Sequence, residues 1–188
     1  MPITTLDPKT ALVIVDLQVG ITGSIGGAPH AMADVVARNA ELVAAFRDKG
    51  LPIVFVNVDG APGGRTDHGG GSPRVLPPET LPIEASLGML DTDKLVTKRT
   101  RGAFHGTDLA QHLADNDVTQ VVVTGVATGA GVMATALEAH QHGLNVTLPT
   151  DAMTDRDAER HEVTIKHFLS ETGETGTTAD VLAQLSAR

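Results

Sequence analysis

Short, continuously apolar runs, separated by segments with helical periodicity, constrain the fold of this chain more than any other feature of its sequence. The runs consist mainly of Val, Ile and Leu, and polar residues do not alternate with the apolar ones. Strands of this kind are buried on both faces, as in a parallel sheet that helices cover on its two sides. We expect strands at residues 11–15, 53–58, 95–97, 120–126 and 145–148, and helices at 32–49, 107–114, 130–142, 157–168 and 178–185.

The 188 residues of the chain fit a single domain, spanning residues 1–188, with a sizeable core. Hydrophobic residues make up 41% of the sequence but aromatic residues only 2%, so aliphatic side chains must fill that core. The sequence shows no internal repeat. One segment of low complexity, GAPGGRTDHGGG at residues 60–71, is predicted to be a long flexible loop.

Composition excludes several classes of function. The formal net charge is −9 and no basic cluster extends beyond Lys98, Arg99 and Arg101, so we expect no nucleic-acid partner. The chain has no cysteine, which excludes disulfides, zinc sites with thiolate ligands and cysteine nucleophiles. No apolar run reaches the ~18–20 residues that span a bilayer, and the first residues lack the pattern of a signal peptide. We therefore expect no membrane partner and a cytoplasmic location.

Ligand sites in open parallel sheets form just beyond the carboxyl ends of the strands, and this rule selects five places in the chain. They are Asp16, residues 59–68, Lys98, residues 127–131 and Asp151. A carboxylate directly after an apolar strand, such as Asp16, is partly desolvated, which raises its pKa and suits it to general acid or base chemistry. Lys98 would keep such a carboxylate ionised or stabilise negative charge on a substrate. Simpler explanations also exist, since Asp16 could cap a helix and Lys98 could be a solvated lysine.

The turn after the expected strand at 120–126 is rich in glycine, with Gly125, Gly129 and Gly131. Glycines let a backbone approach a ligand, and the N-terminus of the following helix offers N–H groups to an anion. Glycine is also common where a helix only packs tightly on a strand. The turn is therefore a candidate wall of a binding pocket.

A dinucleotide-binding site is a rival interpretation of this turn. Residues 129–134 match the pattern G-x-G-x-x-G/A, and Asp151 lies about 20 residues further on. We discount this interpretation because too few residues follow Asp151 for a second nucleotide-binding half, and because Asp16 and Lys98 would have no role. We therefore expect no cofactor.

Other polar residues belong to the glycine-rich loop. Arg65 and Arg74 could clamp a substrate carboxylate, although surface arginines are common in loops. Asp59, Asp67 and His68 could hold a metal ion, but their spacing matches no strong template, and the chain has no H-E-x-x-H motif. We expect no metal site.

Three segments, in this order along the chain, resemble the isochorismatase-like hydrolase superfamily, which includes nicotinamidases and N-carbamoylsarcosine amidohydrolases. They are TALVIVDLQ at residues 10–18, VTKRTRGAFHGTDL at residues 96–109 and VVVTGVATGAGVMATALEAHQHGLNVTLPTDAMTD at residues 121–155. The resemblance implies a three-layer α-β-α fold around a Rossmann-like parallel sheet of about six strands. It also implies a homodimer or homotetramer, and a cis peptide bond between Val126 and Ala127.

In most of that family an Asp, a Lys and a Cys form the catalytic triad. The resemblance assigns the Asp to Asp16 and the Lys to Lys98, whereas the position of the Cys falls on Gly131. Thr128 and Thr135 are nearby hydroxyls, but neither occupies that position. Without a thiolate, the family's route through a thioester is closed.

The superfamily's isochorismatases also lack the cysteine. In them an Asp protonates a vinyl ether and water attacks the resulting centre, which needs no nucleophilic side chain. Gly131 is compatible with that chemistry. However, isochorismatases usually carry a Tyr where Ala127 stands and a His where Gly129 stands, so the substrate is left open.

We therefore predict an enzyme that hydrolyses a small metabolite, either an anion or an amide or vinyl ether, with Asp16 as general acid/base and Lys98 as its partner. The residues that we expect to contact the substrate are Gln18, Arg65, Arg74, Val126, Ala127, Thr128 and Gly131. The alternative, favoured by the missing cysteine, is a homologue that binds a small molecule without converting it.

Overall fold

The computed structural model describes residues 3–67 and 69–188 and is built around one parallel sheet. The strand order is β11-β9-β8-β1-β2-β7, and the short β10 pairs with β8. Every pair of neighbouring strands in this sheet is parallel. The strands are β1 (Thr10–Val15), β2 (Ile53–Val58), β7 (Lys94–Lys98), β8 (Gln120–Val126), β9 (Asn145–Pro149), β10 (Met153–Thr154) and β11 (Glu174–Gly176).

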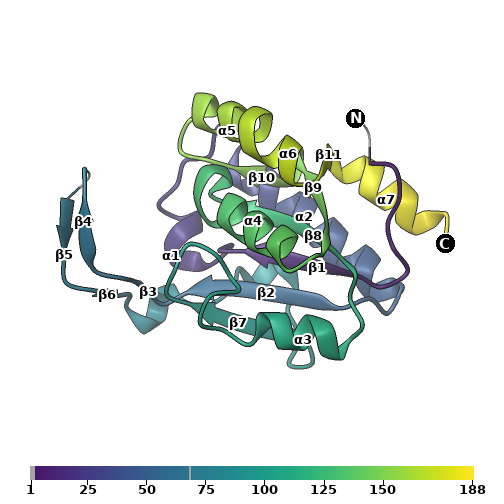
Figure 1. Ribbon diagram of the computed structural model, residues 1–188, viewed down its shortest axis with the longest axis horizontal. Coiled ribbons are helices and arrows are strands. Elements are labelled where there is room, and N and C mark those ends of the chain that lie inside the picture. Colours follow the sequence, from purple (N-terminus) through teal and green to yellow (C-terminus); the bar gives the residue numbers. More distant parts are fainter. Residues whose placement is uncertain (1–2, 68) are drawn as a thin grey trace.

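Helices cover both faces of the sheet, so the chain has the predicted three-layer α/β architecture (Figure 1). The α-helices are α1 (Val19–Thr22), α2 (Met32–Asp48), α3 (Leu109–Asp115), α4 (Met133–Gln141), α5 (Ala158–Thr164), α6 (Ser170–Thr172) and α7 (Thr178–Ser186). Short 3-10 turns occupy η1 (Pro78–Thr80), η2 (Ala85–Leu87) and η4 (Thr150–Ala152), and π-helical turns occupy η3 (Thr128–Val132) and η5 (Ile165–Leu169). Within the described residues, no helix combines the length and apolar character needed to cross a membrane.

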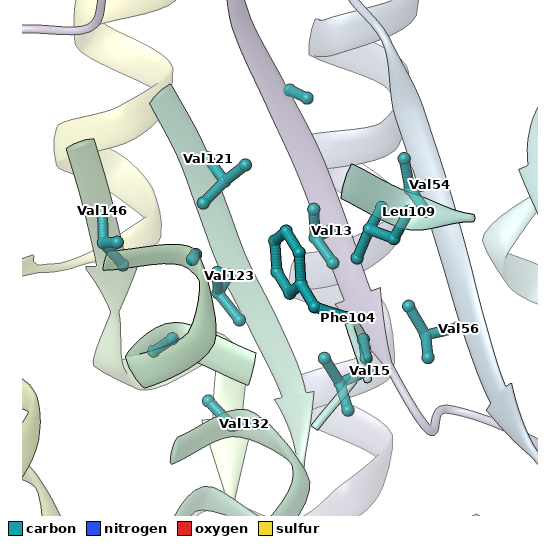
Figure 2. Packing of buried hydrophobic residues seen from close by; sticks show 14 of the residues in the cluster. Val13, Val15, Val54, Val56, Phe104, Leu109, Val121, Val123, Val132 and Val146 are labelled. Carbon is teal, nitrogen blue, oxygen red and sulfur yellow. The ribbon is translucent and has the colours of Figure 1, made fainter. Parts of the chain in front are cut away.

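Two separate cores explain why the strands are apolar without alternation. Successive side chains of a strand point to opposite faces. Val13 and Val15 of β1 therefore join the core beneath α3 and α4, whereas Leu12 and Ile14 join the core beneath α2 and α7. Figure 2 shows the first of these cores, in which valines from several strands surround Phe104. Each fully buried aliphatic side chain contributes about 1.5–3 kcal/mol to folding.

The segment at residues 60–71 differs from its prediction. Its described residues belong to an antiparallel two-stranded arm, in which β3 (Gly60–Ala61) pairs with β6 (Arg74–Val75) and β4 (Gly64–Thr66) pairs with β5 (Gly69–Gly71). The prediction was wrong because composition alone does not distinguish glycines that confer flexibility from glycines that a hairpin requires.

Smaller differences lie at the ends of elements. The helix expected at 107–114 begins at Leu109, and the helix expected at 130–142 begins with the π-helical turn η3. The helix expected at 157–168 divides into α5 and η5. The short strands β10 and β11 were not predicted, since runs of two or three mixed residues carry no periodic signal.

Candidate functional site

Asp16 and Lys98 form a buried ion pair at the carboxyl edge of the sheet. Asp16 follows β1 and Lys98 ends β7, on either side of β2. The Nζ atom of Lys98 donates to Oδ2 of Asp16 at 2.8 Å and to the carbonyl oxygen of Thr100 at 3.2 Å. The two residues are only 6% and 2% exposed. Strand order therefore brings together two side chains that lie 82 residues apart in the sequence.

Hydrogen bonds reach only one of the two carboxylate oxygens of Asp16 within the described residues. Its Oδ1 atom is buried and has no hydrogen-bond partner in the described part of the chain. Its backbone has a φ of 55°, a conformation that costs energy in a residue other than glycine. Unpaired buried oxygens and strained backbone both occur more often at functional sites than elsewhere.

Burial controls the protonation of Asp16. Desolvation raises the pKa of its carboxyl group from 3.8 to about 6, because a buried carboxylate loses its hydration. The charge of Lys98 and its hydrogen bond lower this pKa in part. Near neutral pH the group can therefore exist in both protonation states, as a general acid or base must.

The turn between β8 and α4 lies against this pair. The peptide bond between Val126 and Ala127 is cis, and η3 follows it. A Cβ atom at Gly131 would lie 3.0 Å from Oδ2 of Asp16 and 3.0 Å from Cγ1 of Val15. Position 131, where the family resemblance puts the cysteine, therefore faces the carboxylate directly, and any side chain there would press on Asp16.

Three side chains that the sequence reasoning missed hold this turn. Oδ2 of the fully buried Asp155 accepts from the backbone N–H of Gly129 at 2.6 Å. Nη2 of Arg160 donates to the carbonyl oxygen of Gly129 at 2.7 Å, and Nδ1 of His161 lies 2.8 Å from the hydroxyl of Thr128. Burial, together with the charge of His30, lowers the pKa of His161 to about 4, so its imidazole is neutral near pH 7.

The strand-end rule selected Asp151 in this region instead. Its Oδ1 atom accepts from the backbone N–H and the hydroxyl of Thr178, at 2.7 and 2.9 Å, and therefore binds the first turn of α7. Since this carboxylate is used within the fold, it is not placed to bind a ribose. Asp155, which follows the short β10, gave no signal because that strand cannot be recognised from two residues.

Gln18 is buried but its amide is occupied by the fold. Nε2 donates to the carbonyl oxygens of Val58 and Thr80, each at 3.1 Å, and Oε1 accepts from the N–H of Val58 at 2.7 Å. The structure thus gives Gln18 the contacts of an anchor between β1 and β2 rather than of a residue open to substrate.

Arg65 and Arg74 are not brought to the Asp16–Lys98 pair of their own chain. Both lie on the arm of residues 60–75, which projects away from the sheet (Figure 1). Asp59 forms a two-point ion pair with Arg99, at 2.9 Å for each contact. His68 lies outside the described residues. Within them, no three His, Asp or Glu side chains gather as metal ligands would.

Comparison with known proteins identifies the family of this chain. The family model described as "Isochorismatase domain" matches residues 10–180. The chain is 40% identical over 185 residues to the uncharacterized isochorismatase family protein YwoC of Bacillus subtilis, covering 94% of each. It is 30% identical over 188 residues to a maleamate amidohydrolase of Pseudomonas putida, covering 94% of this chain and 87% of that one.

A solved structure of an isochorismatase family protein from Burkholderia thailandensis superposes with a TM-score of 0.89, at 37% identity and with 98% of each chain covered. The similarity thus extends over sequence and fold alike. The described chain also lacks any cysteine. We conclude that this chain belongs to the isochorismatase family of hydrolases, as a member without a cysteine.

Proposed function

We propose that the chain hydrolyses a small carboxylate-bearing metabolite by proton transfer at Asp16, without a covalent intermediate. The observation that carries this proposal is the state of the Asp16 carboxyl group. Lys98 holds its Oδ2 atom at 2.8 Å, whereas its buried Oδ1 atom is unpartnered. Oδ1 is therefore the atom that exchanges a proton with substrate or water.

With a pKa of about 6, Asp16 can either donate a proton to the substrate or accept one from water. With a vinyl ether, the protonated group donates to the vinyl carbon, and water adds to the resulting cation. The proton that this water releases returns to Asp16, and the hemiketal breaks down to a ketone and an alcohol. With an amide, the ionised group takes a proton from the attacking water and delivers it to the leaving nitrogen.

Lys98 and the turn have supporting roles in this proposal. The ammonium of Lys98 fixes the carboxyl group and stabilises its ionised state between proton transfers. In this proposal the backbone of Val126, Ala127, Thr128 and Gly131 contacts the substrate, because Gly131 lies against Oδ2 of Asp16. Glycine at position 131 supplies no nucleophile, so water attacks directly and no thioester forms.

The substrate class rests on the relatives. One is named a maleamate amidohydrolase and the matching family model is named for isochorismatase, so both an amide and a vinyl ether belong in the test. Parent protein and Asp16→Asn are incubated with maleamate, isochorismate and related amides and esters, and products are identified by NMR. The proposal expects turnover of at least one compound by the parent, and a loss of about 10²–10⁴-fold in Asp16→Asn. Equal turnover by both proteins would refute it.

A binding protein is the second candidate, because Gly131 removes the nucleophile that most of the family uses. A ligand from the same panel that saturates the parent and is recovered unchanged would favour this candidate. We also propose that the protein works as a homo-oligomer, as the family resemblance implies.

A further inference from the structure

The centre of the turn between β8 and α4 has few side chains with which to fix its own position. Gly129 and Gly131 have none, and the backbone angles of Gly129 lie outside the helical range. The turn is nevertheless packed closely on the site, since a Cβ atom at position 131 would lie 3.0 Å from Oδ2 of Asp16. Contacts from outside the turn therefore decide how closely it lies on Asp16.

Asp155 and Arg160 both bind the same residue of this turn. Oδ2 of Asp155 accepts from the backbone N–H of Gly129 at 2.6 Å, and Nη2 of Arg160 donates to the carbonyl oxygen of Gly129 at 2.7 Å. Nε of Arg160 also lies 3.6 Å from Oδ2 of Asp155. The two side chains thus close a ring on Gly129 through charge-assisted hydrogen bonds, which are stronger than neutral ones.

The missing side chain of Gly129 makes room for this arrangement. A Cβ atom at position 129 would lie 2.7 Å from Nε and 3.1 Å from Cγ of Arg160, and 2.8 Å from Oγ1 of Thr164. The φ of Gly129 is −84°, which other residues also adopt, so the backbone conformation does not require glycine here. Glycine is required by the side chains of α5, above all by Arg160, which fills the space that a side chain of residue 129 would take.

The groups that bind Gly129 are themselves anchored. Asp155 is fully buried; its backbone N–H donates to the carbonyl oxygen of Ala28 at 3.1 Å, and its carbonyl oxygen accepts from the N–H of Ala28 at 2.9 Å. Asp157 caps α5 by accepting from the backbone N–H of Arg160 at 2.7 Å. The turn is therefore held by groups that are fixed in the fold.

We infer that Asp155 and Arg160 are positioning residues of the candidate site, because their contacts with Gly129 hold the turn closed over the carboxyl group of Asp16. They act through the turn, since within the described residues Lys98 is the charged side chain that pairs with Asp16. The inference rests on the proposed function only for its effect on turnover, because the closure of the turn can be measured without a substrate.

Closure of the turn affects the protonation of Asp16. Burial is the largest cause that acts on the pKa of this group and raises it to about 6. If the turn opens, water reaches the carboxylate and its pKa falls toward 3.8. Loss of the charge of Arg160 without any movement has the opposite sign, because removal of a cation raises the pKa of a nearby carboxyl group. The direction of the change therefore separates positioning from a direct electrostatic effect.

The pKa of Asp16 is measured by NMR titration of its carboxyl carbon, with Asp16→Asn to identify the signal. We expect Arg160→Met to lower the midpoint by at least about 0.5 pH unit, and Arg160→Lys, which keeps a donor for Gly129, to recover part of this change. Arg47→Met is the matched control, because Nη2 of Arg47 lies 2.6 Å from Oδ2 of Asp93 and its side chain is 33% exposed, against 42% for Arg160. The control should lose stability without moving the midpoint of Asp16.

If Arg160→Met does not fold, Gly129→Ala takes its place with the same expectation, since its methyl group displaces the guanidinium. Where the parent turns over a substrate, the break in its kcat/KM profile should move to lower pH by the same amount. A midpoint that rises or stays fixed in Arg160→Met, or that falls equally in Arg47→Met, would overturn the inference. Because the titration needs no turnover, an inactive parent would count against the proposed hydrolysis alone.

Discussion

The free energy of unfolding of this protein should fall as the pH rises from about 4 to about 6, because Asp16 titrates in this range. Burial raises the pKa of this group from 3.8 to about 6. Between these values the unfolded chain has already released a proton that the folded chain still holds, so a rise in pH favours the unfolded state. The contribution of Asp16 to the free energy of unfolding is fully present below pH ~4. One pKa unit corresponds to about 1.4 kcal/mol, so this free energy should fall by about 3 kcal/mol across the range.

The assay is urea unfolding of the parent and of Asp16→Asn across this pH range. Asn has nearly the same shape and does not titrate, so the variant reports the pH dependence of all other groups, and the difference between the two proteins isolates Asp16. In Lys98→Met the loss should shift to higher pH, because the ammonium that lowers the pKa of Asp16 is gone. A difference that does not vary with pH, or that favours the parent increasingly as the pH rises, would refute the reasoning.

Three further predictions concern the turn that faces Asp16. Gly131→Ala places a methyl group 3.0 Å from Oδ2 of Asp16 and should lower turnover by displacing the carboxylate, whereas the outward Gly143→Ala, as a control, should affect stability alone. Asp155→Asn weakens a buried charged hydrogen bond and should lower the free energy of unfolding by about 1.5–3 kcal/mol, measured in urea, and a change below 0.5 kcal/mol would contradict this. The imidazole of His161 should remain neutral in an NMR titration until the pH falls to about 4, and a midpoint near 6.5 would show that it is not buried as described.

The central strands could be predicted because their pattern has a single physical explanation. Residues 121–126 are mostly β-branched and interrupted by no charged residue, as expected of a strand that is buried on both faces. The same logic located Asp16 and Lys98, since a polar residue directly after such a strand lies at the carboxyl edge. Their contact depends on strand order, which the sequence pattern does not determine. Only the family resemblance indicated that the two residues belong to one site.

Other features could not be predicted because their cause is tertiary. The role of Asp155 depends on β10, two residues long, and on the distance of 2.6 Å to Gly129. Asp151, selected by the strand-end rule, accepts two hydrogen bonds from Thr178 in the first turn of α7. The glycines of the arm were interpreted from composition as a flexible loop. Only the pairing of Gly70 with Arg65 shows why a side chain is excluded at position 70.

The pH dependence of kcat/KM for whichever substrate the parent turns over tests the account most directly. The account predicts a break near pH 6 that disappears in Asp16→Asn, with activity falling above it if Asp16 acts as an acid and rising through it if Asp16 acts as a base. A profile without this break, or a break that persists in Asp16→Asn, would show that the proton is carried by another group.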